Sequence, residues 1–99
     1  MDVEFVGEVV EWRGPAPYWF LRVPAEESED IKLAARGLEY WGQVPVTVRI
    51  RGTVFTTALF PRHGCYLVPL KVAARERAGI DLETDRELAA GLDVGRTDR

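Results

Sequence analysis

The sequence predicts a mainly β fold: a small antiparallel barrel, closed or half-open, that also contains two short helices. Residues 46–51 alternate strictly between apolar and polar side chains, which is the pattern of a half-buried strand. Several other short runs of β-branched and aromatic residues are separated by turns that contain glycine or proline, as in small barrels. Because the chain has 99 residues and one cysteine, we expect a single domain over residues 2–94 without a disulfide, and a frayed tail at 95–99.

The N-terminal part of the chain predicts a hairpin. Residues 3–12, "VEFVGEVVEW", read as a first strand, and the change of apolar phase near Gly7 suggests a bulge there. Residues 13–17, "RGPAP", have the composition of a loop, and the aromatic run "YWFLRV" at 18–23 follows as a second strand.

A helix is predicted next, from Pro24 in the first turn to a left-handed stop at Gly37. The charged side chains complement the helix dipole, with acids near the start and bases near the end: Glu26, Glu27, Glu29, Asp30, Lys32 and Arg36. At helical spacing, the side chains expected to face the core are Ile31, Ala34, Ala35 and Leu38. Residues 38–45 then form a connector.

The centre of the chain predicts a tight hairpin with its turn at Arg51-Gly52. A second turn follows at 61–64, "PRHG", and then a strand at 65–70 in which Pro69 marks either an end or an edge. A short helix at 71–79 is expected to end at its glycine. The final segment is ambiguous, because Thr84 and Glu87 form a capping box for a helix while residues 87–94 also alternate with period two. We favour a strand at 86–94.

In their order along the chain, these segments carry a family resemblance. The matching positions are Val44-Pro45-Val46, Gly52, Phe55 to Leu59, Gly64, Val68-Pro69-Leu70, Lys71, Arg75 and Gly79-Ile80, together with Trp19, Val23 and Pro24 earlier in the chain. Residues 3–94 therefore resemble DUF1905, a bacterial and archaeal domain family of unknown function. Where the family usually has Gly-Asp before its last strand, this chain has Thr84-Asp85. The resemblance implies a small β-barrel and no established activity.

Charge is distributed unevenly. Residues 49–77 carry a net charge of +5, while residues 1–48 carry −5 and residues 78–99 carry −3. Within the basic segment, Arg49 and Arg51 share one strand face, and Lys71 and Arg75 are four residues apart on a helix. These four side chains are our hypothetical anion-binding face, since guanidinium groups match phosphate-like anions. The alternative is a solvated face whose charges pair with the acidic flanks.

The aromatic residues gather near two loops: Trp12, Tyr18, Trp19, Phe20, Tyr40 and Trp41. We expect most of them to fill or cover the core. Those that are exposed would form a stacking platform for bases or a groove for a peptide, and Trp19 and Trp41 are the candidates beside the basic face.

Catalytic and metal signatures are weak. His63 and Cys65 flank Gly64 without an adjacent Asp or Asn to complete a triad, so we interpret them as a hairpin tip. The acids at 26–30 are explained by the helix dipole, and no phosphate-binding loop or nucleophile elbow is present. We therefore expect no catalytic residue, no metal and no cofactor.

The favoured function is a small non-enzymatic binding module for a small anionic ligand or a protein partner. The alternatives are a DNA-associated regulator, by fold analogy with swapped-hairpin barrels of the AbrB type, and an enzyme that uses an unrecognised carboxylate or the Cys65 thiolate. A pI near 5 argues against general nucleic-acid binding. The acidic start and the lack of a long apolar run predict a cytoplasmic protein that does not associate with membranes. An open edge at Pro69 would favour a homodimer.

Overall fold

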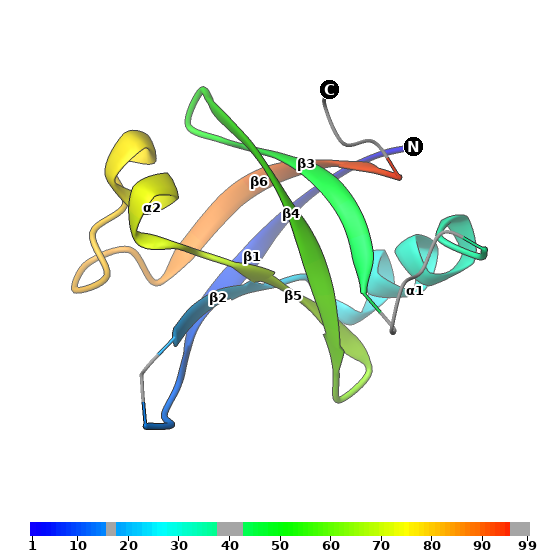
Figure 1. Ribbon diagram of the computed structural model, residues 1–99, viewed down its shortest axis with the longest axis horizontal. Coiled ribbons are helices and arrows are strands. Elements are labelled where there is room, and N and C mark those ends of the chain that lie inside the picture. Colours follow the sequence, from blue (N-terminus) through cyan, green and yellow to red (C-terminus); the bar gives the residue numbers. More distant parts are fainter. Residues whose placement is uncertain (16–17, 38–42, 96–99) are drawn as a thin grey trace.

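A computed structural model describes residues 1–15, 18–37 and 43–95. Six strands form a closed antiparallel barrel in the order β1-β2-β5-β4-β3-β6 (Figure 1). The elements are β1 (Asp2–Trp12), β2 (Tyr18–Arg22), α1 (Ala25–Ala34), β3 (Val44–Ile50), β4 (Thr53–Arg62), β5 (Cys65–Pro69), α2 (Val72–Ala78) and β6 (Glu87–Val94). The predicted mainly β barrel with two short helices is confirmed, and the barrel is closed rather than half-open.

The core is filled by the inward-facing residues of the strands. In β3, Val44, Val46 and Val48 are fully buried and alternate with half-buried residues, as the period-two pattern predicts. Each fully buried side chain of this kind stabilises the fold by about 1.5–3 kcal/mol. The two helices lie on opposite sides of the barrel (Figure 1), and both contribute small or apolar side chains to the same core.

The predicted N-terminal hairpin is confirmed, but the predicted bulge at Gly7 is wrong. Residues 2–8 of β1 pair with β6 and residues 8–12 pair with β2, in both cases without an extra residue. The buried face runs continuously through Val3, Phe5 and Gly7 to Val9. A Cβ atom at Gly7 would overlap the carbonyl oxygen of Arg22. The glycine is therefore required by a close approach of two backbones.

Helix α1 is confirmed, with Pro24 as its N-cap, but it ends at Ala34 and not at the predicted stop, Gly37, which has a left-handed φ of 82° in the turn that follows. Ile31 and Ala35 are buried as predicted. Ala34 is exposed, contrary to prediction, because it lies at the flank of the buried stripe. The predicted core position Leu38 and most of the predicted connector lie outside the described residues.

The sequence pattern missed Ser28, which is buried in α1. Its Oγ donates a hydrogen bond to the carbonyl oxygen of Val23 (3.1 Å) and accepts one from the backbone N–H of Tyr66 (2.9 Å). A hydroxyl can do both at once. Ser28 therefore fastens the helix to the strand β5.

Two two-residue turns shape the β3–β4 and β4–β5 hairpins. Arg51 and Gly52 have φ values of 51° and 76°, and His63 and Gly64 have values of 52° and 79°. Positive φ at both positions matches the twist of the flanking strands. The predicted turn at Arg51-Gly52 is confirmed, whereas the predicted turn at 61–64 is shorter than expected because β4 continues to Arg62.

The C-terminal half decides how the barrel closes. Helix α2 ends at the left-handed Gly79, and β5 ends at Pro69, as predicted. The favoured strand at the C-terminus is confirmed, because β6 pairs with both β1 and β3. Since β5 lies between β2 and β4, the open edge that favoured a homodimer is absent from the described strands. A homodimer itself stays untested.

Candidate functional site

The four predicted anion-binding residues lie in different surroundings. Arg49 points outward from β3, over Gly91, and its Nη1 lies 3.4 Å from Asp2 Oδ1. Arg75 Nε donates a hydrogen bond to the carbonyl oxygen of Leu70 (3.0 Å). Lys71 is exposed at the N-cap of α2 and lines a cavity with residues of β2 and β4 that none of the three arginines lines.

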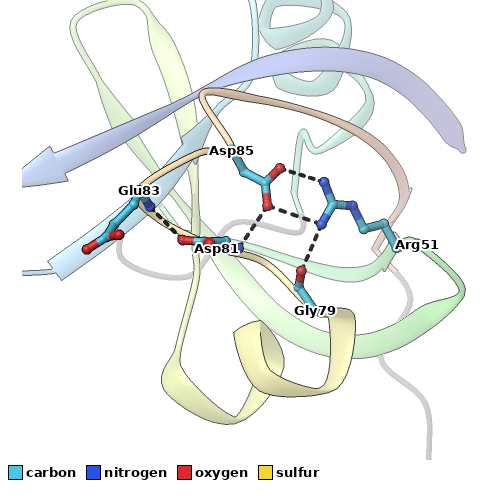
Figure 2. A network of polar contacts seen from close by, with 5 residues as sticks. All are labelled: Arg51, Gly79, Asp81, Glu83 and Asp85. Carbon is cyan, nitrogen blue, oxygen red and sulfur yellow. Dashed lines mark hydrogen bonds and ion pairs between the residues drawn. The ribbon is translucent and has the colours of Figure 1, made fainter.

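Arg51 is engaged in a polar network at the turn between β3 and β4 (Figure 2). Its guanidinium donates two hydrogen bonds to Asp85 (2.8 and 3.1 Å) and one to the carbonyl oxygen of Gly79 (2.9 Å). Asp85 also accepts a hydrogen bond from the Asp81 N–H (2.8 Å). The hydrogen bonds from Arg51, and then that from Asp81, lower the pKa of Asp85, and Asp85 raises the pKa of Arg51. Arg51 thus ties the turn to the end of α2 and to the segment before β6.

The other predicted candidates also have definite places. Trp19 is half-buried and packs against the core, and Trp41 lies outside the described residues. His63 is exposed at the tip of the β4–β5 hairpin, and Cys65 is a half-buried free thiol on the outward side of β5. Within the described ranges, no group of three or more His, Cys, Asp or Glu side chains is arranged to hold a metal ion.

A different surface has the features of a binding site. The outward positions of four neighbouring strands, β1, β2, β5 and β4, carry large apolar side chains: Val10, Trp12, Tyr18, Phe20, Phe60 and Leu67. Three of them remain well exposed, namely Trp12 (42%), Tyr18 (61%) and Phe60 (38%). We call these six side chains the aromatic groove. It lies across two hairpins, β1–β2 and β4–β5, whose ends project from the barrel (Figure 1).

The groove is hollowed by three neighbouring cavities of about 360, 630 and 440 Å³. The first and second cavities share Trp12, Phe20, Arg62 and Leu67. The second and third share Tyr18, Phe20 and Phe60. Phe20 lines all three cavities, so the cavities adjoin one another around its ring.

The aromatic rings hold one another in place. The ring centroids of Tyr18 and Phe20 are 6.4 Å apart, and those of Phe20 and Phe60 are 6.3 Å apart in an edge-to-face arrangement. Across the groove, the guanidinium carbon of Arg62 lies 3.8 Å from the centre of the Trp12 ring. Such a cation–π contact contributes about 0.5–1 kcal/mol at an exposed site. It links the end of one hairpin to the end of the other.

Basic side chains line all three cavities of the groove. At the first cavity, Arg13 pairs with Glu11 (3.5 Å) and Arg22 pairs with Glu8 (2.7 Å). Arg62 lines this cavity too, and the described part of the chain gives it no carboxylate within 4.0 Å. Lys71 lies at the third cavity. Of the four predicted basic residues, Lys71 is thus the one that lies beside the groove.

Strand parity could have located this groove in the sequence. Tyr18 and Phe20 alternate with Trp19 and Leu21, and only the second pair packs against or within the core. Treating the aromatic residues as one cluster hid this alternation. Phe60 gave no signal, because its place beside Phe20 depends on the pairing of β2 and β4 with β5.

A comparison with family models gives a match over residues 5–88, to a domain of unknown function, DUF1905. The chain belongs to the DUF1905 family. The predicted resemblance is confirmed, and the match includes both hairpins of the aromatic groove. A comparison with curated proteins found no match. Neither described helix of this DUF1905 domain is long and apolar enough to cross a membrane.

Proposed function

We propose that this DUF1905 domain is a non-enzymatic binding module and that its ligand occupies the aromatic groove. The observation that carries the proposal is the exposure of Trp12, Tyr18 and Phe60 on one hollowed face of a barrel whose core is filled by other side chains. Large apolar side chains gathered in a concave surface are typical of binding sites, because a ligand removes them from water.

The polar groups around the groove suit recognition better than proton transfer. Two guanidinium groups and their carboxylates are joined in ion pairs at the first cavity, and Arg62 adds a cation over the Trp12 ring. A general base needs a basic group held within reach of a reacting proton, whereas His63 lies at an exposed turn. We therefore assign these groups to the orientation of a ligand that carries negative charge.

The DNA-regulator alternative receives less support. A swapped-hairpin barrel is completed by strands from two chains, whereas here one chain supplies all six strands of the closed barrel. The overall net charge of −3 also opposes attraction to a polyanion. We do not extend that analogy to this domain.

The proposal is tested by titrating the ¹⁵N-labelled domain with an aromatic anion, 1-anilinonaphthalene-8-sulfonate, and following amide chemical shifts. We expect the largest shifts at the aromatic groove and weaker binding in Trp12→Ala and Tyr18→Ala. The matched controls are Val6→Ala and Leu33→Ala, which shorten exposed apolar side chains outside the groove. Shifts centred elsewhere, or equal losses in the control variants, would refute the proposal.

A further inference from the structure

We infer that the aromatic groove takes a small aromatic carboxylate, with its ring in the second cavity and its carboxylate on the edge of the Arg62 guanidinium. This inference rests on the proposed function, since it names the class of ligand for the same groove and the residue that recognises its charge. Three observations on the described residues carry it: the free donors of Arg62, the contact of its guanidinium with Trp12, and the lining of the second cavity.

Arg62 is a basic residue with free donors at the junction of two cavities. It is exposed at the end of β4 and lines both the first and the second cavity. The other two arginines of the first cavity, Arg13 and Arg22, are paired with glutamates at 3.5 and 2.7 Å. In the described part of the chain, Arg62 has no hydrogen-bond acceptor and no carboxylate within 4.0 Å, and its contact is the Trp12 ring. An anion that enters the groove can therefore bind Arg62 without displacing a carboxylate.

The contact with Trp12 holds the guanidinium by its face and leaves its edge available. The guanidinium carbon of Arg62 lies 3.8 Å from the centre of the Trp12 ring, which is a van der Waals contact distance. The five N–H donors of a guanidinium lie in its own plane, so a ring against its face does not use them. Two parallel donors on one edge match the two oxygens of a carboxylate. Because the ring also restrains the Arg62 side chain, less side-chain freedom is lost when the anion binds.

The second cavity suits an uncharged aromatic body. Among the described residues that line it, Arg62 is the one with a charge, and four of the others are aromatic: Trp12, Tyr18, Phe20 and Phe60. Aromatic rings favour another ring in edge-to-face or offset contact. The volume of about 630 Å³ lies within the range of small-molecule pockets, about 300–1,000 Å³. A ligand with one anionic group at Arg62 and a body of one or two rings fits this cavity.

The same lining argues against other classes of anion. A polynucleotide carries a phosphate at every nucleotide, and in the second cavity it would meet a single cation among the described residues. A free amino acid also carries an ammonium group, and none of the described residues that line this cavity is an acid that could pair with it. A saturated fatty acid would satisfy Arg62 but would make no ring–ring contact.

The experiment is a chemical-shift titration of the ¹⁵N-labelled domain with 1-naphthaleneacetate. Its matched ligands are 1-naphthaleneacetamide, which has the same shape without the charge, and octanoate, which carries the carboxylate on an aliphatic chain. We expect naphthaleneacetate to shift the backbone amides of the second cavity and the side-chain N–H signal of Arg62. The amide should bind about two- to fivefold more weakly, because the ion pair is exposed, and added salt should reduce this margin. Octanoate should bind at least about twofold more weakly, because it lacks the ring.

Arg62→Gln separates the recognition of the charge from the packing of the groove. We expect this variant to bind the acid and the amide equally, since the preference for the acid depends on the guanidinium. Arg62→Lys keeps the charge but loses the paired donors, so its preference for the acid should be intermediate. Arg36→Gln, exposed in the turn after α1, is the matched control and should keep the full preference.

The outcomes separate this inference from the proposed function. If the anilinonaphthalene sulfonate occupies the groove but naphthaleneacetate does not, the inference is overturned and the binding groove stands. The same conclusion follows if wild type binds the acid and the amide equally, or if Arg62→Gln keeps the preference for the acid. If octanoate binds as tightly as naphthaleneacetate, the aromatic class of ligand is overturned. If no probe shifts the groove, both proposals fail.

Discussion

Gly7 lies where β1 exchanges one partner strand for another, and its replacement by alanine should destabilise the barrel. The added Cβ would overlap the carbonyl oxygen of Arg22 and would lie 2.9 Å from Phe5 Cε2. A carbonyl oxygen in a strand cannot move without the strand itself. Forcing extra volume into such a site typically costs about 1–3 kcal/mol. For a domain of this size, each lost kcal/mol lowers the melting temperature by about 4–8 °C.

Gly91→Ala is the matched control, because it makes the same chemical change in the neighbouring strand β6. There the added Cβ would meet the guanidinium group of Arg49, which is the end of a flexible side chain. The cost is at most the exposed pair of Arg49 with Asp2, about 0–1 kcal/mol. Removing a glycine restricts the unfolded chain equally in both variants, worth about 0.4–1 kcal/mol in favour of folding. Thermal and urea unfolding followed by circular dichroism measure both, and equal stabilities would refute the steric argument.

Two further predictions concern stability. Ser28→Ala removes the acceptor of the buried Tyr66 N–H and should lower the free energy of unfolding by about 1–3 kcal/mol. The control variant Glu29→Ala changes an exposed residue of the same helix and should have little effect. Equal melting temperatures for the two variants would contradict the role of the Ser28 hydroxyl. Asp85→Asn tests the lowered pKa of Asp85: the stabilisation by its carboxylate is complete above the unfolded pKa of about 3.9 and is lost as pH falls through the lower folded value. The difference in melting temperature between wild type and this variant should therefore be large at neutral pH and shrink on acidification below about pH 4, and a difference that stays constant with pH would contradict the lowered pKa of Asp85.

Local features of the chain predicted most of the elements. The alternation around Val46 and Val48, the Arg51-Gly52 turn and the glycine after α2 depend on neighbours a few residues away, and each was located correctly. The errors arose where contacts between residues far apart along the chain decided the structure and the local sequence pattern did not. Near Gly7 the apparent change of phase comes from Val10, which faces outward into the aromatic groove. A sequence pattern cannot separate a bulge from an apolar side chain that faces outward.

The candidate site was less predictable. The sequence pointed to the basic segment as an anion-binding face. In the structure, however, the guanidinium group of Arg51 is hydrogen-bonded to Asp85, which is 34 residues away along the chain. Arg49 lies beside Asp2, which is 47 residues away. That these two arginines and Arg75 bind an anion stays a prediction. It is tested by comparing the retention of Arg49→Ala and wild type on an anionic resin, where the variant should be retained less.

By itself, the sequence determined the class of fold, the tight turn at Arg51-Gly52, the end of α2 at Gly79 and the family. These depend on backbone preferences and on side-chain periods within short segments. Only the tertiary structure decided that β6 joins β1 to β3, that the barrel closes, and that Phe60 lies beside Phe20 in the groove. The physical reason is that strand pairing brings together residues far apart along the chain, and no local pattern encodes which outward faces become neighbours.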